Sequence, residues 1–526
     1  MDADLASIQN ARTLLERAHV AQKSFANTPQ DEVDRIVKAM AHAATDHAQE
    51  LAQLAVEESG LGRVESKIQK NLFVSEYLHE AYKNFRTCGV VHEDASRGVI
   101  EIASPVGIVA GIIPITNPTS TAIFKILIAV KGRNAIVLSP HPYGTRCIGR
   151  STEICRRAAI RAGAPEDLIL CMDAPTLEGT QELMRHPLTS VVVATGGPGV
   201  VKAAYSSGKP AFGVGPGNPP VYVHPSADLN HAARCLVASQ TFDYGTICSS
   251  EQSLVVERSV AEEFKAALQK ERVHFCSPDE REKLQRCVQT PEGRLNTKIV
   301  GQAAPRIADM AGFRVAADTT ILVAKEDGVG REFPLSREKL APILAWYEVD
   351  GWKQGCDLCI ELIRYDGDGH TLGIHCRERD IVQAFGLEKP VARIIVNGPT
   401  TQGSIGFSTS LLPSMTLGCG AMGGNITSDN LGPQHLVNIK RIAYPREGFF
   451  HDVGLPLSAA DLAPSGKPST SALPGGENLQ KSSQESTKES TPRTTYGGGA
   501  VSSDVAAMLA RALQPARTPP PREFYR

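Results

Sequence analysis

Between residues 106 and 194 the chain alternates short apolar runs with longer segments of helical spacing. The apolar runs are typical of buried strands and lie at residues 106–113, 134–138, 168–172 and 190–194. The segments between them are predicted to be helices, at residues 120–131, 144–162 and 178–184. Strands that alternate with helices favour a doubly wound parallel sheet, with helices on both faces, so the predicted fold class is α/β.

Further secondary structure is predicted before and after this alternating segment. Residues 5–85 carry apolar side chains at helical spacing and are predicted to be helical. A β-hairpin is predicted over residues 90–104, where two apolar runs flank a polar turn that ends in glycine. A second α/β unit is predicted from about residue 225, with strands at 255–256, 321–323, 343–345 and 393–396. We therefore expect one domain over residues 1–225 and another over 226–429.

The end of the chain has a different composition. From residue 455 to 502 it is dominated by Pro, Ser, Thr, Gly, Lys and Glu, which cannot build a core, so a disordered linker is predicted. Residues 503–514 then read as a short amphipathic helix with Ser503 as its cap. Its apolar stripe consists of Val505, Met508, Leu509, Ala512 and Leu513. Such a short helix is marginal alone, so we expect it to dock on another protein or to fold back on its own domain.

Charge and cysteine content exclude several classes of function. The net charge is −2 and is spread evenly, which argues against nucleic acid and charged membrane surfaces as partners. The 12 cysteines are scattered and follow no secretory signal, so reduced thiols in the cytoplasm are expected. The apolar run at 106–113 is too short to span a bilayer.

Three loops are predicted at the carboxyl ends of the first-domain strands, where parallel sheets bind their ligands. They comprise residues 114–118, 139–142 and 195–199. The third is rich in glycine and opens a helix, so its backbone N–H groups and the helix dipole can hold a phosphate. One such loop could be an ordinary tight turn, but three together favour a binding site. The predicted cofactor contacts are Ile115, Thr116, Ser139, Pro140, His141, Thr195, Gly196 and Gly197.

A second glycine cluster occupies residues 213–219, and Gly213 and Gly215 are also predicted to bind the cofactor. The dinucleotide fingerprint G-x-G-x-x-G is matched only at residues 418–423, which follow no clear strand, so we discount that match. His141 could contact a phosphate or brace its loop. His370, which lies between a glycine and a threonine, is interpreted as a structural residue.

Residues 242–252 place one cysteine, Cys248, between a short polar turn and a predicted strand. Small side chains flank the sulfur, so a substrate could approach it closely. A thiolate is a good nucleophile, and a lowered pKa or an adjacent donor activates it. A buried structural thiol is the alternative for any one of 12 cysteines. The surrounding α/β pattern and its loops favour the nucleophile.

On these residues the chain resembles the aldehyde dehydrogenases over roughly residues 5–445. It is most similar to the CoA-acylating branch, which includes one half of the bifunctional aldehyde-alcohol dehydrogenases and enzymes of bacterial microcompartments. The segments that carry the resemblance are residues 70–83, 104–109, 116–125, 194–199, 242–252, 417–420 and 424–425.

The resemblance implies the aldehyde dehydrogenase fold, with two doubly wound α/β domains and a β-flap for oligomerisation. The flap would combine the hairpin at 90–104 with residues 430–445. Cys248 matches the nucleophile of the family. Asn117 matches the asparagine whose amide, with the backbone N–H of Cys248, stabilises the oxyanion. Glu338 matches the glutamate that contacts the nicotinamide ribose.

Two departures from the hydrolytic branch bear on the reaction. Where those enzymes have a glutamate that activates water, this chain has Gly213 or Val214, and where they have a lysine for the adenosine ribose, it has Ser139. Without a positioned base, water attacks a thioester poorly, and the thiol of coenzyme A can take its place. NAD is the usual cofactor of the family, and no metal is expected.

The implied activity is oxidation of a short-chain aldehyde, acetaldehyde or propionaldehyde, to acyl-CoA by a homodimer or homotetramer. The helix at 503–514 would bind shell or cargo proteins and so place the enzyme in a microcompartment lumen. Three alternatives stay open: a hydrolytic aldehyde dehydrogenase that releases free acid, a catalytically silent scaffold, and a reductase of acyl phosphates.

Overall fold

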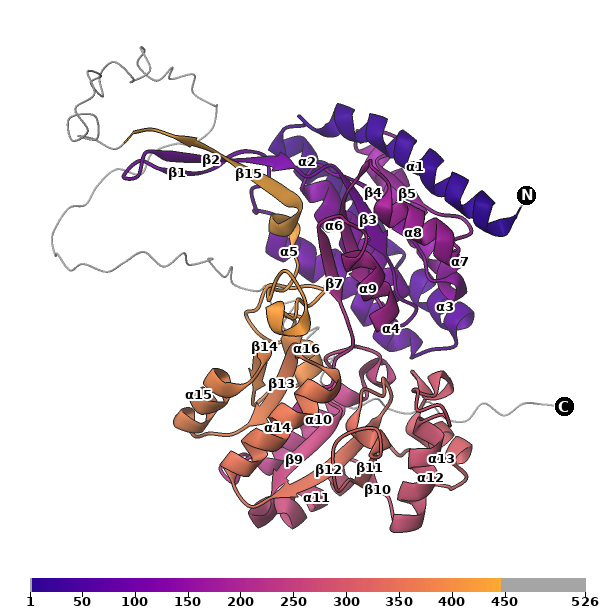
Figure 1. Cartoon of the computed structure of the whole chain (residues 1–526), viewed down its shortest axis with the longest axis vertical. Helices are drawn as coiled ribbons and strands as arrows, with labels where there is room; N and C mark the ends of the chain where they lie inside the picture. Colours follow the sequence, from indigo (N-terminus) through magenta and orange to yellow (C-terminus); the bar gives the residue numbers. More distant parts are fainter. Residues whose placement is uncertain (1, 446–526) are drawn as a thin grey trace. The chain divides into compact units, whose positions relative to one another are not determined.

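The computed structural model describes residues 2–445 (Figure 1). They form two units: the first comprises residues 2–89 and 103–438, and the second comprises residues 90–102 and 439–445. The linker predicted at 455–502 and the helix predicted at 503–514 lie outside the described residues. Within residues 2–445, no helix combines the length and the apolar character needed to cross a bilayer.

The first unit begins with a run of helices, as the apolar spacing of residues 5–85 predicts. They are α1 (Ala3–Phe25), α2 (Gln30–Asp46), α3 (Ala48–Ser59), α4 (Val64–Leu72), the π-helical turn η1 (Phe73–Tyr77) and α5 (Leu78–Tyr82). The Asp2 carboxylate caps α1 by accepting a hydrogen bond from the Asp4 amide. Gly60 ends α3 in the left-handed conformation, at a φ of 69°.

The alternating segment forms a five-stranded parallel sheet in the order β5-β4-β3-β6-β7. Its strands are β3 (Ile108–Ile112), β4 (Ala135–Ser139), β5 (Ile169–Cys171), β6 (Thr189–Thr195) and β7 (Ala211–Val214). The connections are α6 (Pro118–Lys131), η2 (Pro142–Gly144), α7 (Thr145–Arg161), α8 (Leu177–Arg185) and α9 (Pro198–Tyr205). Ile112 pairs with both Ser139 and Ala194, so the three predicted binding loops leave the sheet at one edge.

A second parallel sheet has seven strands in the order β10-β11-β12-β9-β8-β13-β14. These are β8 (Pro220–Val223), β9 (Ser253–Glu257), β10 (His274–Phe275), β11 (Leu322–Lys325), β12 (Ile343–Val349), β13 (Gly369–His375) and β14 (Val391–Val396). Because β8 already pairs with β9 and β13, the chain passes between the sheets within residues 215–219. This crossover precedes the domain boundary expected at residue 225.

Helices and short turns connect the strands of the second sheet and follow its last strand. The helices are α10 (Leu229–Gln240), α11 (Ala261–Lys270), α12 (Pro278–Val288), α13 (Ala304–Ala311), α14 (Trp352–Asp366), α15 (Arg379–Glu388) and α16 (Thr400–Ser404). The 3₁₀ turns are η3 (Phe242–Gly245), η4 (Arg258–Val260), η5 (Thr297–Ile299), η6 (Pro334–Ser336), η7 (Ala421–Gly423) and η8 (Pro433–Leu436).

Apolar side chains on both faces bury the second sheet. Along β11, Leu322 and Ala324 join one apolar cluster, and Val323 between them joins another. This alternation follows from the two-residue repeat of a strand. Each fully buried Leu, Val or Ile contributes about 1.5–3 kcal/mol relative to an exposed one, so a sheet covered on both faces is a rigid support for loops.

The segments predicted to form the flap share a three-stranded sheet in the order β1-β2-β15. The strands are β1 (Gly89–Asp94), β2 (Val99–Pro105) and β15 (Val437–Ala443). Most side chains of β15 are exposed, and Arg441 pairs with Glu101 at 2.9 Å.

Candidate active site

A cavity of about 480 Å³ lies where residues of both parallel sheets meet. The loops that follow β3, β4 and β6 line it from one side, and the segments around Cys248 and Glu338 line it from the other. The cavity brings together twelve of the residues predicted from the sequence: Ile115, Thr116, Asn117, Ser139, Pro140, His141, Thr195, Gly196, Gly197, Gly215, Cys248 and Glu338.

Gly213 does not line this cavity, in contrast to the prediction. It belongs to β7, where its N–H donates to the Tyr205 hydroxyl at 3.1 Å and its carbonyl accepts from the same hydroxyl at 3.0 Å. Both of its backbone polar groups are thus occupied by a side chain of α9, whereas Gly215, two residues later, reaches the cavity.

Cys248 is half-buried, and its sulfur lies 3.1 Å from Nε2 of His370. The other ring nitrogen, Nδ1, lies 2.9 Å from the hydroxyl of Thr371. When Nδ1 carries the proton and donates a hydrogen bond to the Thr371 hydroxyl, Nε2 is unprotonated and its lone pair faces the thiol. His370, interpreted from the sequence as structural, is therefore in direct contact with the candidate nucleophile.

The protonation states suit this pair. Burial, with a smaller effect of Arg393, lowers the pKa of His370 to about 3, so the ring is neutral near neutral pH. Burial, with the nearby Glu338, raises the pKa of Cys248 to about 12, so the resting sulfur is a thiol. A neutral imidazole in contact with a thiol accepts its hydrogen bond. Because the pKa of the imidazole lies far below that of the thiol, the proton passes to His370 only as the sulfur bonds to carbon and loses its negative charge.

Asn117 begins α6 directly after the loop that leaves β3. Its Nδ2 donates to the carbonyl of Thr246 at 3.2 Å, and its Oδ1 accepts from the ammonium of Lys70 at 2.5 Å. Because Thr246 is two residues before Cys248, this contact ties the amide to the cysteine segment. Nδ2 also donates to the hydroxyl of Thr116 at 3.2 Å, so both of its protons are engaged. The predicted role of Asn117 as an oxyanion donor therefore requires one of these two acceptors to be exchanged for the substrate oxygen.

Glu338 is the one carboxylic acid among the residues that line the cavity. Its Oε1 accepts from the amide of Gly217 at 2.8 Å, and burial raises its pKa to about 8. A carboxyl that is protonated near neutral pH keeps one donor as well as acceptor capacity, which suits a sugar hydroxyl. The predicted contact with a ribose stays a prediction.

The loops of the five-stranded sheet suit a dinucleotide. Gly197 caps α9, and Pro198 at its first position has no N–H of its own. A Cβ at Gly197 or at Gly215 would meet no atom within 4 Å, so the backbone faces open space that a phosphate could fill. His141 lines the cavity and also accepts the Tyr143 amide at 3.2 Å, so it braces its loop.

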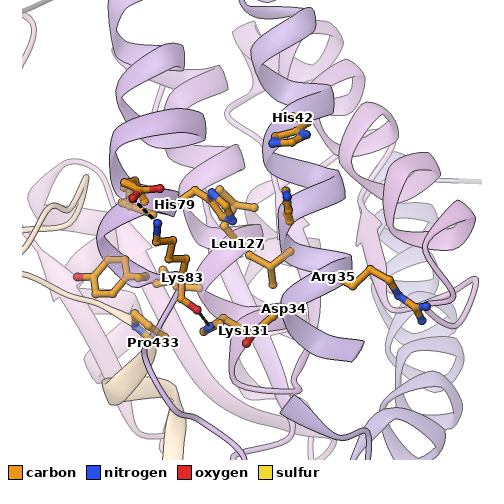
Figure 2. A pocket seen from close by; sticks show the side chains of 14 residues that line it. Asp34, Arg35, His42, His79, Lys83, Leu127, Lys131 and Pro433 are labelled. Atoms are coloured by element: carbon orange, nitrogen blue, oxygen red, sulfur yellow. Dashed lines mark hydrogen bonds and ion pairs between the residues drawn. The ribbon is translucent and has the colours of Figure 1, made fainter. Parts of the chain in front are cut away.

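A second cavity, of about 540 Å³, lies among α2, α5 and α6 (Figure 2). Two ion pairs lie on its walls, Lys131 with Asp34 at 2.6 Å and Lys83 with Glu80 at 2.5 Å. Figure 2 labels Asp34, Lys83 and Lys131. It shares no lining residue with the cavity around Cys248. The volume of a cavity alone therefore does not identify the candidate active site.

Covalent catalysis needs a nucleophile, a proton acceptor and a donor for the developing charge, and all three meet at Cys248. The fold and the site thus define the class of two-domain α/β enzymes that form a thiol adduct with their substrate. The sequence profile of the aldehyde dehydrogenase family matches residues 2–283.

The chain belongs to the aldehyde dehydrogenase family. The bifunctional aldehyde-alcohol dehydrogenase of Escherichia coli is 42% identical over 475 residues, which cover 88% of this chain and 53% of that protein. The chain thus spans about half the length of this curated relative.

Two solved structures extend the comparison. An acetylating aldehyde dehydrogenase from Geobacillus thermoglucosidasius is 51% identical with a TM-score of 0.84, covering 85% of this chain and 98% of that one. A propionaldehyde dehydrogenase from the fucose utilisation microcompartment of Clostridium phytofermentans is 27% identical with a TM-score of 0.75, covering 82% and 97%. These relatives confirm the resemblance to the CoA-acylating branch and the predicted α/β fold.

Proposed function

We propose that the protein oxidises a short-chain aldehyde, acetaldehyde or propionaldehyde, to its acyl-CoA with reduction of NAD. The observation that carries the proposal is the contact between Cys248 and a neutral His370. Cys248 and Asn117 both line the cavity. The names of the relatives, one of them an acetylating aldehyde dehydrogenase, support it.

In the first half of the reaction, His370 accepts the Cys248 proton at Nε2 while the sulfur attacks the aldehyde carbonyl carbon. The carbonyl oxygen becomes an oxyanion, which the Asn117 amide and the backbone N–H of Cys248 stabilise. NAD, bound by the loops of the five-stranded sheet and by Glu338, supplies the acceptor for the hydride that leaves the same carbon. Loss of that hydride leaves an acyl thioester on Cys248.

In the second half, the thiol of coenzyme A attacks the thioester and Cys248 leaves as the thiolate. The proton taken up in the first half leaves His370 for solvent, and the neutral imidazole then accepts the proton of the coenzyme A thiol and returns it to the Cys248 sulfur. Val214, one of the two residues that match the position of the water-activating glutamate in hydrolytic enzymes, lines the cavity. An apolar side chain there offers water no base, so the thioester should persist until a thiol arrives.

The deciding experiment is an assay of the purified protein with acetaldehyde and NAD, with and without coenzyme A. We expect one NADH per active site without coenzyme A, and sustained turnover with formation of acyl-CoA when it is present. Full NADH production with release of free acid in its absence would instead establish the hydrolytic alternative. A series of aldehydes of increasing length, assayed with NAD and NADP, identifies the preferred substrate and cofactor.

We further propose that the enzyme forms a homodimer or homotetramer through the sheet β1-β2-β15, whose β15 exposes most of its side chains. We also propose that residues 503–514 bind shell or cargo proteins of a bacterial microcompartment. A microcompartment enzyme among the structural relatives supports this location.

A further inference from the structure

A buried group of charges stands behind Asn117. Lys70, on α4, donates from Nζ to three oxygens: Oδ1 of Asn117 at 2.5 Å, Oδ2 of Asp243 at 2.5 Å and Oγ1 of Thr246 at 3.1 Å. Its relative exposure is 2%, and that of Asp243 is 0%. The ammonium therefore uses all three of its protons on protein atoms, and one of them orients the asparagine.

A second lysine of the same helix reaches the same carboxylate. Lys67, three residues earlier and therefore on the same face of α4, donates to Oδ2 of Asp243 at 2.9 Å and to the carbonyl of Thr116 at 3.1 Å. It makes no hydrogen bond with Asn117 among the described residues. The two lysines thus share one partner but differ in whether they touch the amide.

The group carries more positive than negative charge. Burial alone would raise the pKa of Asp243, but Lys67 and Lys70 hold it below its usual value, so this acid is ionised. Burial lowers the pKa of Lys70 to about 8 against the attraction of Asp243. With both lysines protonated, two cations face one anion, and an uncompensated buried charge is costly. One lysine would suffice to neutralise Asp243.

The backbone that presents Asp243 is also strained. Asp243 and Tyr244 have φ values of 51° and 53°, in the left-handed region. Aspartate tolerates this region, but a bulky side chain such as that of Tyr244 rarely adopts it, so the strain lies at Tyr244. Strain and excess charge concentrated beside a nucleophile are typical of a catalytic requirement, because neither serves stability.

We infer that Lys70 is a positioning residue that sets the oxyanion hole. The oxygen and nitrogen ends of an asparagine amide have nearly the same shape, and only the oxygen accepts a hydrogen bond from an ammonium. Lys70 therefore fixes Oδ1 on its own side. Nδ2 then lies on the opposite side, where it donates to the carbonyl of Thr246 and the hydroxyl of Thr116 and can exchange one of these acceptors for the substrate oxygen. Its positive charge also favours the negative charge that develops on that oxygen. This inference rests on the proposed aldehyde oxidation.

The two lysines provide a matched pair of variants. Lys70→Met leaves a neutral pair of Lys67 and Asp243, and Lys67→Met leaves a neutral pair of Lys70 and Asp243, so each removes one buried cation. Only the first frees the Asn117 amide. Single-turnover formation of NADH reports the step in which the oxyanion forms, and thermal unfolding reports stability.

We expect Lys70→Met to lower this rate by about tenfold to a hundredfold, somewhat less than the loss of an oxyanion donor itself, with little change in the KM for aldehyde. Lys67→Met should shift the melting temperature by a similar amount but keep the rate within about threefold of the unaltered protein. Lys70→Gln, which can still donate to Oδ1, should recover part of the rate and serves if the methionine variant does not fold.

The pH dependence of the single-turnover rate distinguishes an effect of the positive charge of Lys70 from an effect of its packing. The titratable groups that face Lys70 are Lys67 on its own helix and, from the cysteine segment, the carboxylate of Asp243 and the thiol of Cys248. The rate in the unaltered protein should bend downward as the pH rises through about 8 and Lys70 loses its proton. Lys70→Met should reduce this bend to the part contributed by Glu338, whose pKa is also about 8, and Lys67→Met should keep the whole bend.

Equal rates for the two methionine variants, or a bend that is identical in Lys70→Met and in the unaltered protein, would overturn the role of Lys70. An unaltered protein that forms no NADH from aldehyde would overturn the proposed function itself, which separates the two failures.

Discussion

At the residue scale, the proposed oxidation of an aldehyde depends on the imidazole of His370, which burial keeps neutral. Because the pKa of His370 is about 3, its protonation does not weaken catalysis as the pH falls toward about 6. His370→Ala removes the proton acceptor while the pKa of Cys248 stays raised by burial. We expect the NADH burst to fall by about 10²–10⁴-fold. It should then rise about tenfold per pH unit, since the thiolate fraction grows at that rate below the thiol pKa. Stopped-flow absorbance measures both effects.

His375 offers a control on the same strand. It is also buried, with a pKa lowered to about 4 by burial, but it lies five residues along β13, or about 16 Å from His370. His375→Ala should keep the pH dependence of the unaltered protein. A His370→Ala variant with an unchanged burst would show that some other group deprotonates Cys248.

The sequence predicted the site residues that stand in local motifs. It did not predict those whose role depends on contact with a residue far away in the sequence. Cys248 and Asn117 stand in recognisable segments, and the structure brings both to one cavity. His370 contacts Cys248 across 122 residues of sequence, and Lys70 contacts Asp243 across 173. Neither stands in a pattern that pairs it with a distant partner, so only the fold reveals these contacts.

At the scale of elements, the glycine-rich crossover between β7 and β8 holds the cysteine segment in place. A Cβ at Gly217 would lie 2.0 Å from the carbonyl oxygen of Cys248, a backbone atom that cannot move aside cheaply. Gly217→Ala should therefore displace Cys248 and lower the melting temperature, with a loss of at least about 1–3 kcal/mol in the free energy of unfolding. Thermal and urea unfolding measure this loss.

Gly215, two residues earlier in the same crossover, is the matched control. A Cβ there would meet no atom within 4 Å, so Gly215→Ala should leave the melting temperature unchanged. Because Gly215 lines the cavity, the same variant should raise the KM for NAD if the residue binds the cofactor as predicted. Equal melting temperatures for both variants would contradict the close approach at Gly217.

Four strands of the first sheet, β3 to β6, were predictable because each is a short apolar run between helices. β7 was not predicted, because it runs into the glycine cluster at residues 213–219. The order β5-β4-β3-β6-β7 and the point of crossover were not, because pairing depends on contacts between distant segments. Residues 220–223 have the same apolar character as the earlier strands, so nothing local marked them as part of the second sheet.

At the scale of the whole molecule, residues 2–445 contain both parallel sheets and the complete cavity around Cys248. Changes in residues 503–514 should therefore alter where the enzyme is located without altering its catalytic activity. The predicted stripe of residues 503–514 contains Leu509, and a charge there would oppose docking on an apolar surface. We expect Leu509→Asp in the full chain to keep the kcat and KM for aldehyde and to lose association with microcompartment shells.

A fluorescent protein that carries residues 503–514 tests the same claim without the enzyme. In bacteria that produce shells, the fusion should concentrate in discrete foci that coincide with a labelled shell protein, and the fusion with Leu509→Asp should be diffuse. Lys488, in the predicted linker and outside the stripe, provides the control, since Lys488→Asp in the full chain should leave the enzyme in foci. A diffuse signal from the unaltered fusion would contradict the proposed targeting, and the helix would then be assigned to its own domain.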